Sequence, residues 1–296
     1  MEGSVGSLLL SQLPVIVVDG ITLGLQLGLV AVGITMIFGQ AQILNLSHGE
    51  FAVTASIVAA LTIPLIGVTP AVLAGISAAT AFSAFVYKVV LYPAFKRSGE
   101  QRILLGLFIT LGLYLALHGY FTNQFPTTYL SIRPEIQTVE LLGNSFRFSA
   151  ILAAAISTAI LIALAVFLRS TMVGKSIRAV SQNEMGAEIV GIPIDRVRLV
   201  TFLTGGALSG SAGIIRGLAA TMGPESGIEL TILALLISVV GGIRSIPGTV
   251  ASGLLLGIVY MVASFLVGTY LSVVIMLTAA ILVLLFRPQG LLGELE

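Results

Sequence analysis

Long uncharged apolar runs are the feature that most constrains how this chain folds. Several of them continue for about twenty residues, the length that an α-helix needs to cross about 30 Å of hydrocarbon. Composition agrees, because 57% of the 296 residues are hydrophobic, 9% are charged and the mean hydropathy is +1.10. The sequence therefore predicts an all-α, polytopic integral membrane protein rather than one or two soluble domains.

The apolar runs predict eight or nine transmembrane helices in a single transmembrane domain that covers residues 1–296. The expected spans lie at about 14–38, 47–67, 70–91, 103–121, 148–168, 199–222, 230–240, 249–267 and 270–286. The first residues lack a basic region and the first apolar run continues into a full span, so we expect no cleavable signal peptide.

A polar stretch at 169–198 separates the fifth and sixth expected spans. Its basic residues are Arg169, Lys175, Arg178, Arg196 and Arg198. Short loops rich in Lys and Arg remain on the cytoplasmic side, so we expect this loop in the cytoplasm. With nine spans, the N-terminus is then outside and the C-terminus is cytoplasmic.

Asp19 and three arginines fall near the opposite, outer side in this topology. Asp19 lies near the outer end of the first span, Arg133 and Arg147 lie in the loop before the fifth span, and Arg216 lies near the outer end of the sixth. The three arginines are the main exceptions to the charge rule.

The middle of the 169–198 loop predicts a short helix. Asn183 can cap its start, Gly191 suits the left-handed position at its end, and Pro193 prevents continuation. Its apolar face would consist of Met185, Ile189 and Ile192. From the residues alone two interpretations remain open: a connector that lies on the membrane surface, or a helix that docks onto a partner.

Glycines spaced four residues apart predict close helix packing. Gly20, Gly24 and Gly28 share one face of the first span, and Gly206 and Gly210 share one face of the sixth. Small residues at this spacing let a second helix approach closely in a membrane.

A dense polar group interrupts the apolar sequence after the first span. It consists of Asn45, Ser47, His48 and Glu50. Ser47 and Glu50 have the spacing of a capping box, which would give them a structural role at a helix start. Polar residues at membrane depth are also candidates for a translocation pathway, and the sequence leaves both roles open.

A weak internal repeat relates the two halves of the chain. At a constant offset, Ser47 aligns with Ser226 and Glu50 with Glu229. The pattern predicts repeats at about 14–121 and 199–286, with opposite orientations in the membrane. Inverted repeats are a transporter architecture, with the pathway near the repeat interface.

Several kinds of chemistry are not supported by the residues. The chain has no cysteine and two histidines, which argues against thiolate catalysis and against a metal site. The Gly174-Lys175-Ser176 stretch lacks the preceding glycine of a phosphate-binding loop. We expect no catalytic residues, no cofactor, no metal and no nucleic-acid partner, with membrane lipid as the surroundings.

Motifs along nearly the whole chain resemble one family. They are GITLG at 20–24, ILNLSHGE at 43–50, GKSIRA at 174–179, GI at 191–192 with DRV at 195–197, TF at 201–202 with GGA at 205–207, GGI at 241–243 with SIPG at 245–248, and RPQGLLG at 287–293. In these stretches the chain is similar to permease subunits of bacterial and archaeal branched-chain amino acid ABC importers, of the type called LivH. Arg244 departs from the family, which usually has glycine there.

The resemblance implies a non-catalytic pore subunit in the bacterial or archaeal plasma membrane. Its partners would be a second permease of the LivM type, two ATP-binding subunits and an extracytoplasmic solute-binding protein. The 169–198 loop would then be a coupling loop, and the residues expected to contact the ATPase are Glu184, Met185, Ala187, Ile189, Gly191, Asp195 and Arg196, with Arg198 beside them at the rim. A permease for urea or short amides and a stand-alone secondary transporter remain alternatives.

Overall fold

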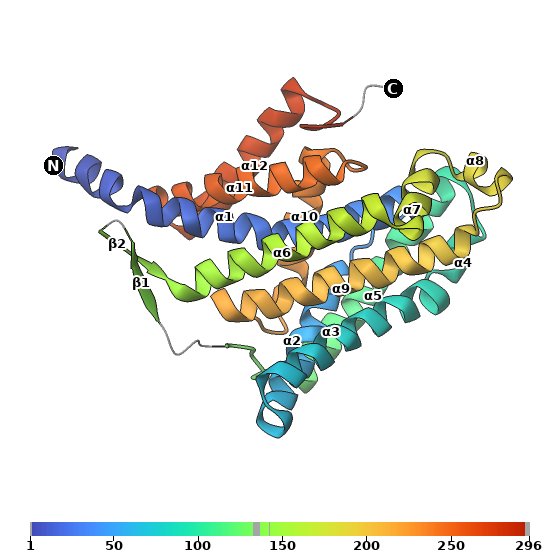
Figure 1. Ribbon diagram of the computed structural model, residues 1–296, viewed down its shortest axis with the longest axis horizontal. Coiled ribbons are helices and arrows are strands. Elements are labelled where there is room, and N and C mark those ends of the chain that lie inside the picture. The colour runs from blue at the N-terminus through green and yellow to red at the C-terminus, as the bar shows by residue number, and fades with distance from the viewer. Residues whose placement is uncertain (1, 133–136, 142, 294–296) are drawn as a thin grey trace.

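The computed structural model describes residues 2–132, 137–141 and 143–293, so Arg133 lies outside the described part (Figure 1). The helices are α1 (Glu2–Ala41), α2 (His48–Ile66), α3 (Val68–Phe85), the π-helix η1 (Val86–Val90), α4 (Tyr92–Phe95), α5 (Gly99–Gln124), α6 (Phe148–Ser170), α7 (Met172–Gln182), α8 (Glu184–Ile189), α9 (Ile194–Ala219), α10 (Ser226–Gly241), α11 (Ile246–Val267) and α12 (Thr269–Phe286). The strands β1 (Thr138–Leu141) and β2 (Asn144–Arg147) form an antiparallel hairpin.

Eight of the described helices are long and apolar enough to cross a membrane. The shorter apolar helix is α10, whose 16 residues extend for about 24 Å. The fold is therefore the all-α polytopic membrane fold that the sequence predicts. The short elements α4, α7, β1 and β2 were not predicted from the sequence.

The long helices run roughly along one axis of the molecule (Figure 1). Helices α1, α6 and α9 contact one another, α11 packs on α1, and α2 and α3 pack on α9. Helices α7 and α8 lie at one end, which we call the loop end, and the β1–β2 hairpin and the N-terminus lie at the other, which we call the hairpin end.

Glycines bring α1 and α11 into close contact. A Cβ added to Gly24 would collide with the backbone of Gly253, and one added to Gly20 would lie 2.8 Å from the Cα of Ile258. Gly28 differs from the expectation, because a Cβ there would meet no atom within 4 Å. Close approach therefore constrains the first two positions of this face and not the third.

The two α9 glycines pack against α3. A Cβ on Gly206 would collide with the side chain of Ser83, and one on Gly210 would lie 2.8 Å from the Cβ of Ala79. The Ser83 hydroxyl also donates a hydrogen bond to the Phe202 carbonyl. These contacts place α9 at the centre of the bundle, between α1 and the α2–α3 pair.

A broken segment connects α1 to α2. Helix α1 ends at Ala41, Gln42 adopts a positive φ of 52°, and residues 42–45 continue without regular structure into the protein interior. There the Thr110 hydroxyl of α5 donates to the Leu44 carbonyl and accepts from the Leu46 N–H, both at 3.1 Å. Since buried backbone groups require partners, Thr110 allows this irregular segment to lie inside the bundle.

The capping boxes expected at the starts of α2 and α10 are not formed. Ser47 makes no side-chain bond to the α2 N-terminus, because its N–H and hydroxyl both bind Asn45 Oδ1, at 3.1 and 2.8 Å. In α10 the N-cap is Glu225, without a side-chain cap, and Ser226 Oγ accepts from the Gly223 N–H. Both serines therefore form hydrogen bonds within local turns instead of capping a helix as their spacing predicts.

Candidate functional site

The polar connection at the loop end is shorter and more ordered than the sequence predicts. It spans residues 171–193 and contains two helices, α7 and α8. Arg169 belongs to the last turn of α6, and Asp195, Arg196 and Arg198 belong to α9. The residues expected to contact the ATPase therefore belong to two helices and the turn between them, because α8 ends at Ile189 and Pro193 is the N-cap of α9, which carries Asp195 and Arg196.

Helix α7 was not predicted, although the sequence shows the pattern of an amphipathic helix there. Thr171 caps it by accepting a hydrogen bond from the Gly174 N–H at 2.9 Å. Ile177 and Val180 face the core, whereas Lys175 and Arg178 are exposed. This alternation at helical spacing, preceded by a threonine, is typical of an amphipathic surface helix.

The start and end of α8 agree with the sequence. Asn183 Oδ1 accepts from the Gly186 N–H at 2.9 Å. At the other end Gly191 has a φ of +84°, and the Ile192 N–H bonds to the Ala187 carbonyl at 3.0 Å. This geometry closes a six-residue helix with a glycine in the left-handed conformation.

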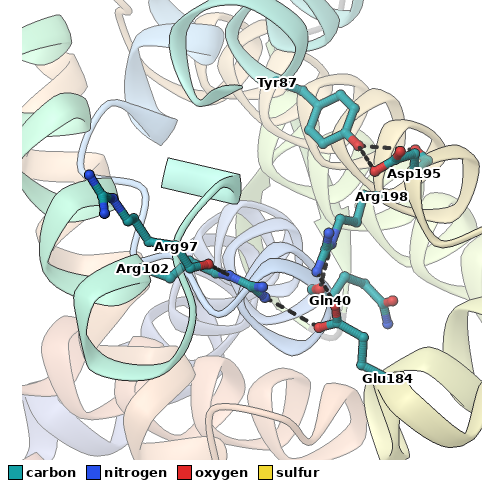
Figure 2. Close-up of polar contacts among 7 residues, drawn as sticks. All are labelled: Gln40, Tyr87, Arg97, Arg102, Glu184, Asp195 and Arg198. Atoms are coloured by element: carbon teal, nitrogen blue, oxygen red, sulfur yellow. Dashed lines mark hydrogen bonds and ion pairs between the residues drawn. The ribbon is translucent and has the colours of Figure 1, made fainter. Parts of the chain in front are cut away.

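Glu184 connects α8 to two long helices (Figure 2). Its Oε1 accepts from Arg198 Nη2 of α9 at 2.5 Å, and its Oε2 pairs with Arg102 Nη1 of α5 at 3.3 Å. Arg102 Nε also donates to the Arg97 carbonyl at 2.9 Å. Glu184, which we expect to contact an ATPase subunit, thus holds α8 to α5 and α9 within this chain.

Arg198 is buried, so its expected place at the rim of a docking surface is wrong. Besides Glu184, its guanidinium donates from Nε to the Gln40 carbonyl at 3.2 Å and stacks over the Phe95 ring at 5.1 Å. An arginine can satisfy several acceptors at once because its planar group carries five N–H donors. Arg198 therefore joins α8, α9 and the end of α1.

Asp195 and Arg196, on the first turn of α9, have different surroundings. The Tyr87 hydroxyl donates to the Asp195 carbonyl at 3.1 Å and lies 3.5 Å from its carboxylate (Figure 2). Arg196 is exposed and lines a hollow of about 510 Å³ together with Lys88 and Lys96. The first turn of α9 is thus held against η1 on one side and presents positive charge on the other.

An apolar surface projects from α8. Met185 is 73% exposed and Ile189 is 80% exposed, and Val190 beside them is also exposed. We call these three residues the α8 docking surface. Ile192 is half-buried against the core, so the predicted apolar face of Met185, Ile189 and Ile192 is wrong at Ile192. Ala187 is buried and does not belong to the α8 docking surface.

The polar group at the start of α2 lies deep inside the protein. Asn45, Ser47, His48 and Glu50 are completely buried. Asn45 Nδ2, both ring nitrogens of His48 and both carboxyl oxygens of Glu50 have no hydrogen-bond partner among the described residues. A buried polar atom without a partner costs about 1–3 kcal/mol, so these atoms are suited to bind water or a polar solute.

The first turns of α2 and α10 meet at this depth. Gly49 and Gly227 are so close that a Cβ on either one would collide with the other helix, and the Gly49 N–H donates to Thr231 Oγ1 at 2.9 Å. The Glu50 carboxyl lies against Gly227. On the His48 side, Ser209 of α9 donates to the His48 carbonyl at 2.9 Å.

Three hydroxyl residues that bond to the backbone of residues 44–49, in and around this group, were not found from the sequence. They are Thr110, Ser209 and Thr231. Each is a single hydroxyl in an apolar helix, and such residues often bond to their own helix backbone, as Thr231 also does to the Gly227 carbonyl. Only packing shows which of them faces a second segment.

Comparison with known proteins agrees with this architecture. The sequence model of the family described as branched-chain amino acid transport system / permease component matches residues 16–286. The chain is 29% identical to the high-affinity branched-chain amino acid transport system permease protein LivH of Salmonella typhimurium, over 94% of each protein. It is 27% identical to the corresponding protein BraD of Pseudomonas aeruginosa, over 94% of this chain and 95% of that protein.

Two further matches cover a similar share of the chain. A probable LivH of Methanocaldococcus jannaschii is 28% identical over 90% of this chain and 88% of that protein. The solved structure of PsaBC from Streptococcus pneumoniae in complex with Fab covers 92% of this chain and 91% of its own, at 13% identity and a TM-score of 0.49. The match to the family sequence model covers most of the chain, and the chain therefore belongs to the family of permease components of branched-chain amino acid transport systems.

Proposed function

We propose that this chain is a non-catalytic pore subunit of an ATP-driven importer that moves branched-chain or related amino acids inward across the plasma membrane. Two partner subunits would hydrolyse ATP, a second permease of the LivM type would complete the pore, and an external binding protein would deliver the solute. Support for the solute comes from relatives that match nearly the whole chain and are named as high-affinity branched-chain amino acid transport permeases.

The loop end faces the cytoplasm in this proposal. Lys175, Arg178 and Arg196 are exposed there, and exposed basic residues next to spans favour the cytoplasmic side. The N-terminus, at the hairpin end, is then outside, and α12 returns the chain to the cytoplasm.

The α8 docking surface is the observation that carries the coupling role. Large apolar side chains are expected towards lipid, but Met185 and Ile189 project from a polar loop whose exposed residues include Lys175, Arg178 and Glu188. Full burial of one such side chain contributes about 1.5–3 kcal/mol, so a groove that accepts both would gain several kcal/mol. A short helix that inserts apolar side chains into a partner's groove is a common recognition mode.

The ion pairs of Glu184 connect this surface to the buried polar group. Arg102 lies on α5, whose Thr110 holds the broken segment before α2, and Arg198 lies on α9, whose Ser209 holds the His48 carbonyl. A displacement of α8 by a partner would therefore act on both helices that support the start of α2. We propose that Asn45, Ser47, His48 and Glu50 border the translocation pathway.

The inverted repeats at about 14–121 and 199–286 form part of the same proposal. The helices that follow the break in each repeat are α2 and α10, and their first turns meet at Gly49 and Gly227. Discontinuous helices that meet near the middle of a repeat pair are typical of substrate pathways in transporters.

Co-purification of the complex tests the coupling role. The double variant Met185→Glu with Ile189→Glu should insert in the membrane and retain the second permease, but should lose most of the ATP-binding subunits. Met172→Glu, an equally exposed apolar residue on the neighbouring α7, serves as the matched control. Normal recovery of the ATPase with the double variant would refute docking through α8.

Transport by the reconstituted complex tests the function itself. Proteoliposomes that contain both permeases, the ATPase subunits and the loaded binding protein should accumulate L-leucine only when ATP is present. Accumulation by this chain alone without ATP would instead establish a secondary transporter.

A further inference from the structure

A charged hollow lies between α1, α9, α10, α11 and α12 on the hairpin side of the protein. Its volume is about 200 Å³, which is below the range of 300–1,000 Å³ that is typical of pockets for drug-sized ligands. Two acidic and two basic side chains line it: Asp19, Glu229, Arg147 and Arg216. Charges concentrated in one small hollow of a membrane protein point to a polar solute.

The four charges form two ion pairs with the same arrangement. Arg147 Nη2 lies 2.9 Å from Asp19 Oδ1, and Arg216 Nη2 lies 3.9 Å from Glu229 Oε2. In each pair one partner is shielded and the other is open to solvent: the side chains of Asp19 and Arg216 are 16% and 18% exposed, whereas those of Arg147 and Glu229 are 53% and 57% exposed. We call Asp19 and Arg216 the floor charges and the other two the rim charges.

The contact with Glu229 leaves hydrogen-bond donors of the Arg216 guanidinium free. A charge-assisted hydrogen bond has a length of about 2.7–2.9 Å, so the 3.9 Å between Arg216 and Glu229 is a loose contact. Arg216 Nε is also buried without a hydrogen-bond partner among the described residues. A guanidinium with a free Nε–H can donate two hydrogen bonds to a carboxylate in the bidentate geometry that arginine favours.

The remaining walls suit an aliphatic side chain. Thr22, Leu23, Gln26 and Leu27 follow Asp19 along one face of α1, so polar and apolar groups lie side by side. The other apolar lining residues include Leu233, Tyr260, Met261 and Met276. Methionine and leucine side chains adapt their shape to branched hydrocarbon ligands.

We propose that this hollow binds an aliphatic α-amino acid as its zwitterion, with the ammonium group on Asp19 and the carboxylate on Arg216. The rim charges Arg147 and Glu229 occupy these positions when the solute is absent, and the solute displaces them. The proposal rests on the proposed transport function and deepens it, because it gives the solute a binding site on this chain. It also requires both charged groups on the ligand, so urea and short amides would not fit.

Equilibrium binding of radiolabelled L-leucine to the purified complex in nanodiscs, without binding protein or ATP, tests the proposal. Isoamylamine, which lacks the carboxylate, and 4-methylpentanoate, which lacks the ammonium group, are the competitors. Each analogue should need at least a tenfold higher concentration than unlabelled leucine to displace the radiolabelled leucine. Equal competition by either analogue would overturn the two-charge site.

Floor and rim variants separate a binding role from a structural one. Asp19→Asn and Arg216→Gln should weaken leucine binding at least tenfold. Arg147→Gln and Glu229→Gln should bind leucine at least as tightly as the wild type, because a competing charge is removed. If the pairs only held helices together, both members of a pair would have the same effect, and that result would refute the proposal.

A charge swap covers the case in which a single floor variant fails to assemble. Asp19→Arg combined with Arg147→Asp keeps the ion pair but places a cation on the floor, so the complex should assemble and leucine binding should be lost. Glu140→Gln, an acid of β1 that does not line the hollow, is the control. Wild-type affinity in the swapped variant would overturn the assignment of Asp19.

The same preparations distinguish failure of this site from failure of the transport function. If the wild-type complex takes up leucine with ATP but does not bind it in the hollow at millimolar concentration, the site is refuted and the transport function stands. If ATP-driven leucine uptake is absent, the transport function fails, and the binding measurement still decides whether the hollow takes a zwitterion.

Discussion

Removing the charge of Glu184 should release α8 from the long helices. In Glu184→Gln, buried Arg198 keeps the Gln40 carbonyl and the Phe95 ring but loses its anionic partner, and Arg102 loses the same partner. A hydrogen bond to a charged group is worth about 1.5–3 kcal/mol. Because the Glu184 side chain is 35% exposed, water replaces part of this, and we expect a loss of about 2 kcal/mol in the free energy of opening α8.

Hydrogen exchange measures this opening directly. A loss of about 2 kcal/mol corresponds to about 30-fold faster exchange of the amides that α8 protects. Suitable amides are those of Ala187 and Ile192, which bond to the Asn183 and Ala187 carbonyls at 3.0 Å. The amides in the middle of α9 should remain unchanged, because the helix itself is intact.

Glu188→Gln is the matched control for this experiment. Glu188 is an exposed acid on the same helix and forms no ion pair among the residues that the structure describes. Its neutralisation should change the exchange rates less than about threefold, which corresponds to the small contribution of an exposed charge. Equal acceleration in both variants, or no acceleration in Glu184→Gln, would show that the ion pairs do not hold α8.

Two further predictions concern packing inside the bundle. Gly24→Val should separate α1 from α11 and reduce recovery of folded protein several-fold. Gly28→Ala should have little effect, because a Cβ at Gly28 meets no atom within 4 Å. Thermal stability in detergent compares the two variants, and equal stability would contradict the close contact at Gly24. Thr110→Val should lower the free energy of unfolding by about 2–3 kcal/mol, since it leaves the Leu44 carbonyl and the Leu46 N–H without this partner. Thermal denaturation measures this loss. Thr122→Val is the control, because the Thr122 hydroxyl bonds only within α5.

Most of the helical architecture could be predicted from the sequence because it depends on neighbouring residues. The length of an apolar run decides whether a helix can span the bilayer, and the structure begins and ends the long helices within a few residues of the predicted positions, apart from the N-terminal extension of α1. The start and end of α8 were also local, set by Asn183, Gly191 and Pro193. Helix α7 was missed although its pattern was available.

The errors have one physical origin, which is competition between alternative partners, some of them nearby in the chain and some distant. Ser47 and Glu50 have capping-box spacing, but the Asn45 side chain takes the serine, and the Glu50 carboxyl turns towards α10. Arg198 was assigned to a rim from its position in a basic loop, yet it is buried against Phe95. Spacing along the chain does not show which of several competing contacts is made.

The sequence by itself determined the class of protein, the approximate limits of the long apolar helices, and the turns around α8, because each depends on residues within a few positions of one another. Only the tertiary structure decided that Glu184 pairs with Arg102, that Thr110 supports the segment before α2, and that Asp19 and Arg216 line one hollow. These groups come from helices far apart in the chain, and helix packing alone brings them together.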